Sequence, residues 1–359
     1  MAWGLVLTSS WTWCIGLFLP VLLVRLFGWT GFWLFAIPNV IGCTAFGWIV
    51  TGDRGARLAR RLRNGIVAFA LWTIAFQAFF LVRLFVDPSM DVGLHGLGLA
   101  AVVVVIGFAL WRGSRHEPSA AAWISRAAAG AALGILAWSA SRESFFVDSL
   151  PEPILGHAAA YGAGPFIALG FLACPLLDPT FHWVRARSRS AAPFAWFGLF
   201  FASTLGVTGS MAATGTWHLV PLLGAWVVFQ LLFTLILNAR CLESMDTATP
   251  PAGVRRLAMA ACVVGSSVAV IAWCVPQGVG LFTSSFDVTY LVFLGAYSTL
   301  FPAWVLLGGP GRGAWIMGST VVAGGLAIPG IFDGKTLDLT LATIAIVLTP
   351  LVLRRLRTR

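Results

Sequence analysis

The chain has 359 residues, of which 59% are hydrophobic and only 10% are charged. Because ordinary soluble domains carry about 25% charged residues, this composition excludes a soluble globular protein. The net charge of +10 does not indicate a nucleic-acid-binding protein, since the 23 basic residues form short clusters between apolar runs rather than one basic stripe. We therefore expect a multi-pass membrane protein that contacts the lipid bilayer and has no nucleic-acid partner.

Apolar runs of about 20 residues, the length at which a helix crosses a bilayer core, recur along the whole chain. With Pro, Gly and charge clusters as boundaries, the sequence predicts an all-α bundle of twelve transmembrane helices forming one transmembrane domain, 1–359. The predicted spans are 3–26, 29–51, 65–86, 94–112, 121–140, 155–178, 191–214, 217–238, 257–276, 286–308, 313–332 and 336–354.

The distribution of arginine and lysine predicts the orientation of these spans. With the N-terminus in the cytoplasm, eighteen of the 23 basic residues fall in cytoplasmic segments, and only Arg25, Arg83, Arg142 and Lys335 fall on the outer side. Membrane proteins keep an excess of basic residues in their cytoplasmic loops. We therefore expect an inner-membrane protein with both termini in the cytoplasm.

Span 1 contains a run of hydroxyl and indole side chains near the middle of the membrane. Four hydroxyls, on Thr8, Ser9, Ser10 and Thr12, stand among apolar residues, and Pro20 follows. Polar groups and irregular backbone at membrane depth are tolerated where they line a cavity, so we expect an interrupted helix that binds a small solute. The expected binding residues here are Ser9, Ser10, Trp11, Thr12 and Trp13. The alternative is that the hydroxyls bond to the carbonyls of their own helix or of a neighbouring helix.

Span 6 is the second span that should be interrupted. Its segments Tyr161–Pro165 and Cys174–His182 together contain three prolines, which remove helix hydrogen bonds, so both should be kinked or unwound. The two glycines of the first segment, Gly162 and Gly164, are expected to contribute to the same solute site. Asp178 and His182 lie at its cytoplasmic end, where they could serve as a gate or a proton relay. The alternative is a capping turn, in which Asp178 bonds the Thr180 or Phe181 amide and His182 lies at the interface.

Other polar residues inside predicted spans are weaker candidates, among them Asn39, Gln77 and Gln230, because a single polar residue in a membrane helix usually makes a packing hydrogen bond. No span holds paired carboxylates for a di-iron site, facing histidine pairs for haem, or a Gly-rich phosphate loop. We therefore predict no cofactor and no metal.

Spans 1 and 2 together resemble the opening helices of sodium:solute symporter-like membrane proteins. The similarity covers Ser9–Trp13 and the Phe32-Trp33 pair followed by Pro38-Asn39, about 45 residues in all. The resemblance implies the five-plus-five inverted-repeat fold of the amino acid–polyamine–organocation superfamily, in which helices 1 and 6 are broken. Here it implies a first repeat in 1–140, a second in 155–308 and two extra helices in 313–354. Span 8 offers only Gln230 and Thr234 where sodium-coupled members supply paired hydroxyls, so sodium or proton coupling stays open.

These observations favour a non-enzymatic secondary transporter or permease that moves a small solute by alternating access. A non-transporting accessory or sensory subunit with a membrane-protein partner is the second interpretation, because intramembrane charge is scarce. A membrane-embedded enzyme acting on lipid is the third, with Asp178 and His182 as its only acid and base.

Overall fold

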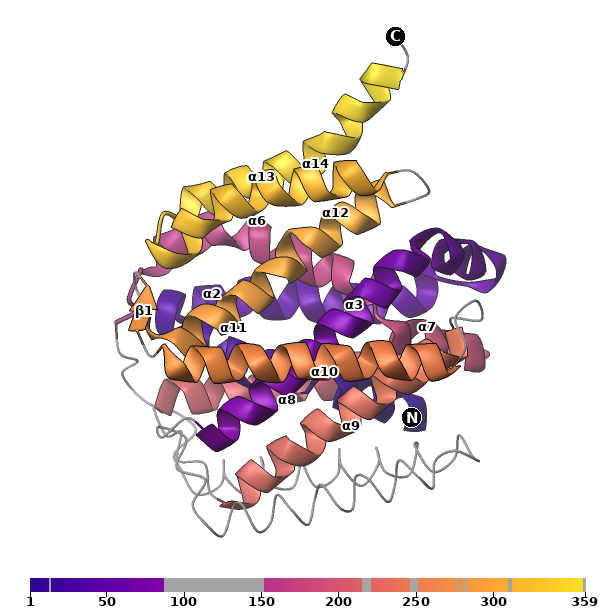
Figure 1. Cartoon of the computed structure of the whole chain (residues 1–359), viewed down its shortest axis with the longest axis horizontal. Helices are drawn as coiled ribbons and strands as arrows, with labels where there is room; N and C mark the ends of the chain where they lie inside the picture. Colours follow the sequence, from indigo (N-terminus) through magenta and orange to yellow (C-terminus); the bar gives the residue numbers. More distant parts are fainter. Residues whose placement is uncertain are drawn as a thin grey trace.

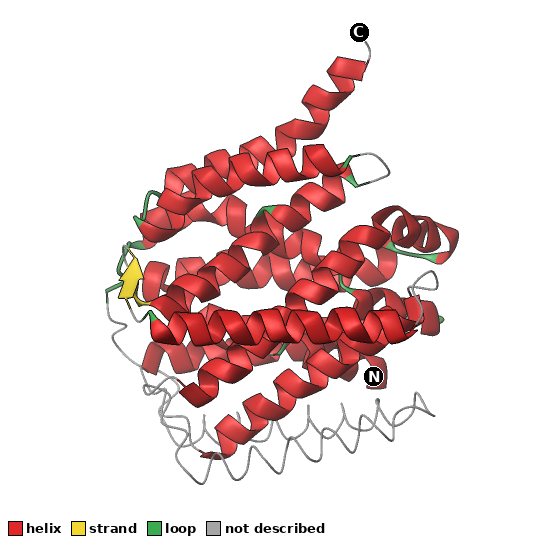
Figure 2. Cartoon of the chain, in the orientation of Figure 1, coloured by secondary structure: helices red, strands yellow, loops and turns green. Residues whose placement is uncertain are grey.

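The computed structural model is a bundle of long, crossing helices (Figures 1 and 2). It describes residues 1–12, 14–86, 152–214, 221–245, 251–275, 277–279, 282–308 and 312–357. The described elements before the middle of the chain are α1 (Ala2–Trp11), α2 (Cys14–Ile49), α3 (Gly52–Val86), α6 (His157–Ala173), the short 3-10 helix η2 (Cys174–Leu176) and α7 (Pro179–Arg187).

The remaining helices complete the bundle, and one small antiparallel hairpin precedes α11. These elements are α8 (Ala192–Thr214), α9 (Pro221–Met245), α10 (Pro251–Cys274), β1 (Gln277–Val279), β2 (Phe282–Ser284), α11 (Ser285–Ser298), α12 (Leu300–Leu307), α13 (Gly313–Phe332) and α14 (Thr336–Arg357). In the hairpin, Gln277 pairs with Ser284 and Val279 with Phe282.

Seven helices in the described residues are long and apolar enough to cross a membrane, so the protein is a multi-pass membrane protein. They lie in 15–49, 52–84, 157–176, 253–274, 285–307, 313–332 and 336–353. The prediction of twelve spans is therefore not met: predicted spans 1 and 2 form a single element, α2, beyond the α1 interruption. The described apolar part of α8, Ala192–Gly206, is also shorter than a full span.

The predicted spans 94–112 and 121–140 lie outside the described residues. They would complete the first of the two predicted repeats, and the helices that the structure describes show no inverted repeat. The division of the chain at 140, 155, 308 and 313 stays a prediction.

A glycine divides α2 into two helical segments. Gly28 has φ +64° and ψ −162°, which is outside the helical region and is accessible to glycine without strain. The carbonyls freed at this break accept hydrogen bonds from a later part of the chain, because Ile154 N–H donates to Arg25 O (3.1 Å) and Leu155 N–H donates to Leu26 O (2.9 Å). These two carbonyls are therefore satisfied without water, as a membrane interior requires.

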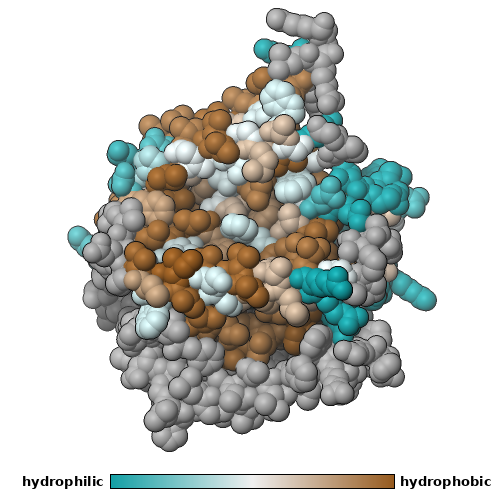
Figure 3. Space-filling view, in the orientation of Figure 1, coloured by the Kyte–Doolittle hydropathy of each residue, from teal (hydrophilic) through white to brown (hydrophobic). Residues whose placement is uncertain are grey.

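Apolar side chains dominate both the core and much of the outer surface. α2 packs on α8 and α6, α3 packs on α10 and α9, and α14 packs on α13 and α6. Many large hydrophobic side chains also face outward, such as Met259 on α10, Val321 on α13 and Leu351 on α14. In Figure 3, hydrophobic residues cover the middle of the visible face, and hydrophilic residues gather mainly toward the ends of the helices. Exposed apolar surface on this scale is what lipid contact requires.

Contacts between distant segments gather the predicted cytoplasmic segments at one end of the bundle. Arg61 Nε donates to Gly308 O (3.0 Å), and Arg185 Nε donates to Val50 O (2.8 Å). At the predicted outer end, Arg83 forms an ion pair with Asp287 at 3.0 Å. The structure thus separates the two groups of segments, while the side of the membrane that each group faces stays a prediction.

Candidate functional site at two interrupted helices

The first interruption lies where the sequence predicts it, in span 1. Helix α1 ends at Trp11, and Thr12 leaves the helical region with φ −84° and ψ 46° while its N–H still bonds to Thr8 O. Helix α2 then begins at Cys14, and Trp13 lies outside the described residues. A helix that stops inside a buried region exposes main-chain polar groups to whatever packs there.

The four hydroxyl residues of span 1 are buried, and three of them bond to their own helix. Thr8 Oγ1 donates to Gly4 O (2.9 Å), Ser10 Oγ to Leu7 O (2.8 Å) and Thr12 Oγ1 to Thr8 O (2.7 Å). These are the bonds of the structural alternative for these residues. Each hydroxyl oxygen keeps lone pairs that can accept a further hydrogen bond.

The glycines of span 6 have a packing role. α6 runs without interruption through Tyr161–Pro165, and Pro165 is accommodated within the helix, so the segment is not unwound. Thr340 Oγ1 of α14 donates to Gly162 O at 2.6 Å, and Thr336 of α14 leaves no room for a Cβ at this glycine. Gly164 lies against Leu34 of α2. Their contacts are with α14 and α2 rather than with Ser9–Thr12.

The second interruption lies at the other end of span 6. α6 gives way to the single turn η2, and the amides of Leu177 and Asp178 both donate to Cys174 O, at 2.9 Å and 3.1 Å. Pro175 and Pro179 explain the change, because neither supplies an amide hydrogen to continue the helix. The predicted break between Cys174 and His182 is confirmed.

Asp178 joins the two interruptions through its two carboxylate oxygens. Oδ1 accepts the Thr180 amide at 2.7 Å, which makes Asp178 the N-cap of α7. Oδ2 accepts the indole Nε1–H of Trp11, also at 2.7 Å. The capping turn was one of the two alternatives for Asp178, whereas nothing in the sequence indicated the bond to Trp11, which lies 167 residues away.

Aromatic rings enclose this junction. The Trp11 ring meets Phe181, Phe197 and Phe201 edge-on, with centroid distances of 5.5, 6.4 and 6.3 Å. Trp11 is 3% exposed and Asp178 is 5% exposed. The short helix α7 packs against α1, α3 and α9, so the carboxyl group lies within a largely dry aromatic shell.

The pKa of the Asp178 carboxyl group lies close to neutral pH. Asp178 lies after Leu176, the last residue of the membrane span. Burial raises the pKa of Asp178 from 3.8 to about 6, because the cost of desolvating the carboxylate exceeds the stabilisation by hydrogen bonds from Trp11, Thr180 and Phe181. A carboxyl group with this pKa can take up and release a proton at physiological pH.

His182 has partners other than the Asp178 side chain. Its Nε2 lies 2.9 Å from Leu176 O, and its ring meets Phe46 edge-on at 5.1 Å. Burial lowers the pKa of His182 from its ordinary value of 6.5, so the imidazole is neutral at pH 7. The two predicted gating residues therefore stand four residues apart on one turn with separate hydrogen-bond partners.

Two glutamines that seemed weak candidates from the sequence become stronger ones. Gln230 Nε2 on α9 donates to Ser9 O at 3.3 Å, and its Oε1 is buried without a hydrogen-bond partner. Gln77 on α3 is fully buried, and neither its amide oxygen nor its amide nitrogen has a partner. Because α3 packs on α9, unpaired amide groups lie on two adjacent helices. A buried polar atom without a partner is rare and calls for a ligand, a water molecule or an ion.

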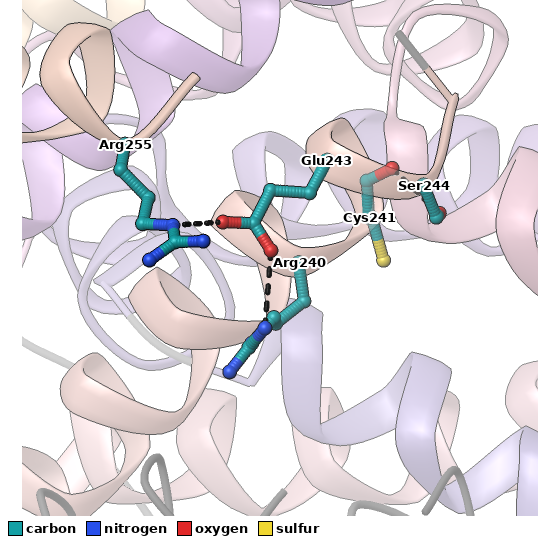
Figure 4. Close-up of polar contacts among 5 residues, drawn as sticks. All are labelled: Arg240, Cys241, Glu243, Ser244 and Arg255. Carbon is teal, nitrogen blue, oxygen red and sulfur yellow. Dashed lines mark hydrogen bonds and ion pairs between the residues drawn. The ribbon is translucent and has the colours of Figure 1, made fainter. Parts of the chain in front are cut away.

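A separate charged cluster links α9 to α10 (Figure 4). Glu243 Oε1 accepts Arg255 Nε and Oε2 accepts Arg240 Nη1, both at 3.0 Å. Ser244 Oγ donates to Cys241 O at 2.9 Å on the same turn. Both carboxylate oxygens of Glu243 are occupied by arginines of the protein itself, so this cluster holds two helices together rather than presenting a binding site.

These features define a multi-pass membrane protein with two interrupted helices that meet at a buried carboxyl group. No protein-family model matches the chain, and no curated protein matches it. The arrangement of residues is therefore the basis for the function proposed next.

Proposed function

We propose that the protein is a secondary transporter or permease that moves a small polar solute across an inner membrane by alternating access. The observation that carries the proposal is the Trp11–Asp178 hydrogen bond, which connects the end of α1 to the interruption after α6. Interrupted helices in transporters present backbone polar groups to a solute and allow one helix part to move against another. The resemblance to five-plus-five inverted-repeat carriers implies the same pair of broken helices.

The proposed solute site lies at the end of α1. Its members are Ser9, Ser10 and Thr12 with the indoles of Trp11 and Trp13, and Gln230 joins them because it bonds to Ser9 O and its own amide oxygen has no partner. Hydroxyls and amides without a fixed charge suit a small polar solute. Gly162 and Gly164 are left out, because they pack against other helices.

Asp178 is the proposed coupling group. Protonation of its carboxyl removes the charge that attracts the Trp11 indole N–H and so weakens the contact between the two interruptions. A proton gradient would then bias the opening of this contact. Proton coupling therefore fits better than sodium coupling, for which span 8 lacks paired hydroxyls. The distribution of basic residues supports both termini being cytoplasmic.

The test is uptake by the purified protein in liposomes with an inward proton gradient, screened across amino acids, sugars and nucleobases. We expect gradient-dependent accumulation of one solute class, lost in Asp178→Asn and reduced in Ser10→Ala. Trp273→Phe, which changes an indole on the outer surface of α10, is the control and should transport normally. Undiminished uptake by Asp178→Asn would show that Asp178 does not couple transport to the proton gradient.

The second candidate function is a non-transporting subunit of a membrane complex. The satisfied hydroxyls of Thr8, Ser10 and Thr12 favour it, because they need no solute. It predicts that the protein co-purifies with one stable membrane-protein partner and transports nothing in the liposome assay. A monodisperse protein without a partner would count against this candidate.

A further inference from the structure

An apolar cavity opens between α2, α6, α11 and the α13–α14 pair, and neither Trp11 nor Asp178 lines it. It has about 670 Å³ of space that no atoms fill, part of it open to the surroundings. Leu22, Phe27, Phe166, Ile167 and Leu291 are among its lining residues, and Ser298 has the only polar side chain among the described residues that line it. We propose that this cavity binds one acyl chain of a zwitterionic phospholipid.

The length of the cavity matches one leaflet of a membrane. Its lining runs from Leu26 to Leu19 on α2 and from Ala163 to Phe171 on α6. At a rise of about 1.5 Å per residue these stretches are about 10–12 Å long. Half of a hydrocarbon core is about 15 Å, so an acyl chain lying along α6 stays within its own leaflet.

Charged residues of both signs flank one end of the cavity. Arg25 precedes the lining residue Leu26, and Lys335 stands between the lining residues Ile331 and Leu339. Glu152 is near in sequence to Leu155, whose amide bonds to Leu26 O. Lys335 and Asp333 form only a loose, exposed pair, with Nζ and Oδ2 4.0 Å apart. A phosphate can bind the cations and a headgroup ammonium can bind the carboxylates, which favours phosphatidylethanolamine over an anionic lipid.

A glycine on α11 offers a way to fill the cavity. Gly295 lines the cavity, and a Cβ there would meet only Ile331 Cδ1, at 4.0 Å. We therefore expect the side chain of Gly295→Leu to occupy part of the empty space. Gly318→Leu on α13 is the matched control, because Gly318 is exposed on a membrane helix and a Cβ there meets nothing within 4 Å. Both variants gain similar helix propensity.

The experiment is native mass spectrometry of the full chain, delipidated in mild detergent and titrated with phosphatidylethanolamine or phosphatidylglycerol. We expect one tightly bound phosphatidylethanolamine on the wild type and on Gly318→Leu. Gly295→Leu should bind it at least about tenfold more weakly, which corresponds to about 1.4 kcal/mol. Equal binding by Gly295→Leu and wild type would overturn the cavity assignment, and a preference for phosphatidylglycerol would overturn the headgroup assignment.

A second measurement covers the case in which Gly295→Leu folds poorly. Phosphatidylethanolamine added to the delipidated wild type should raise its Tm, because a ligand that binds only the folded state stabilises it. Lys335→Gln together with Arg25→Gln should reduce this rise, whereas Arg256→Gln at the opposite end should not. No rise in the wild type would overturn the proposal.

Discussion

Asp178 shows how one side chain can hold two parts of a fold together. One oxygen caps α7 through the Thr180 amide, and the other receives the Trp11 indole. Hydrogen bonds to a charged partner are worth about 1.5–3 kcal/mol, and leaving such a group buried and unpaired costs at least as much. The stability of this region should therefore depend on both oxygens being occupied.

The first prediction concerns Trp11. Trp11→Phe keeps an aromatic ring against Phe181 and Phe201 but leaves Asp178 Oδ2 without its donor. We expect a loss of about 1.5–3 kcal/mol in unfolding free energy, measured by chemical denaturation in detergent. Trp273→Phe makes the same change on an outward-facing side chain, 53% exposed, and should lose less than about 0.5 kcal/mol. Equal losses in the two variants would show that the Trp11–Asp178 bond adds no stability.

The second prediction concerns pH. The pKa of Asp178 is about 6 in the folded protein against 3.8 as its ordinary value, so between these pH values the folded state holds a proton that the unfolded state releases. The contribution of Asp178 to the unfolding free energy is therefore greatest below about pH 4. It falls by about 3 kcal/mol in total as the pH rises to about 6. Above that range the contribution is constant.

Asp178→Asn should remove this fall, because asparagine does not titrate. The variant should also lose unfolding free energy by an amount that does not depend on pH, since its amide nitrogen replaces one of two hydrogen-bond acceptors. The measurement is Tm from pH 4 to pH 7 for both proteins in the same detergent. The Tm of the wild type minus the Tm of Asp178→Asn should fall as the pH rises. Parallel curves would contradict the assigned pKa.

At the scale of single residues, the sequence predicts local contacts better than distant ones. The turn Asp178-Pro179-Thr180 is visible in the sequence, because aspartate before a proline is a common helix cap. Nothing in the sequence around Trp11 indicated its hydrogen bond to Asp178, because that bond depends on how α1 packs against α7. The spare amide groups of Gln77 and Gln230 also emerged only from the packed bundle.

At the scale of helices, Gly28 decides the course of α2. Its backbone conformation is accessible only to glycine without strain, and a Cβ there would overlap the His157 imidazole at the start of α6. The glycine therefore permits both the break in α2 and the close approach of α6.

The third prediction separates these two roles. Gly28→Ala should cost backbone strain of about 1–2 kcal/mol and a further cost of about 1–3 kcal/mol from the overlap with His157. Gly156 has a related conformation, with φ +79° and ψ 162°, but a Cβ there meets nothing within 4 Å. Gly156→Ala should thus show the strain alone. The comparison is made by thermal unfolding, and equal losses would mean that the His157 contact relaxes at little cost.

The positions of helix breaks were partly predictable. Proline and the clustered hydroxyls indicated the interruptions in spans 1 and 6, and the structure has breaks after Trp11 and after Ala173. Gly162 and Gly164 were misleading, because glycines serve close helix packing as well as flexibility. Sequence alone does not distinguish these uses, which depend on whether another helix, here α14 or α2, lies alongside.

At the scale of the whole molecule, charge separates the two ends of the bundle more clearly than the apolar runs fix the number of spans. The arginines at the start of α3, the end of α7 and the start of α10 belong to one end. The predicted boundary between spans 1 and 2 coincides with the break at Gly28, but residues 15–49 form one candidate span, and the described apolar part of α8 is too short to be one. The count of twelve was therefore not met in the described residues.

The fourth prediction concerns the side that each end faces. Arg57 and Lys335 are both exposed and lie at opposite ends. Single cysteines at these positions, in a variant that retains only the three buried cysteines Cys43, Cys174 and Cys241, should react differently with a membrane-impermeant maleimide in intact cells. The basic excess predicts labelling of Lys335→Cys alone. Labelling of Arg57→Cys alone would show that the protein has the opposite orientation to the one proposed.

The two backbone bonds from Ile154 and Leu155 to the end of the first α2 segment also bear on motion. They join the segment preceding α6 to the part of α2 before Gly28. If α6 tilted about the break at Cys174, this part of α2 should therefore move with it. The second half of α2, beyond Gly28, could stay in place. Spin labels on the two halves of α2 should then move apart during the proposed transport cycle, although both halves belong to one element of the structure.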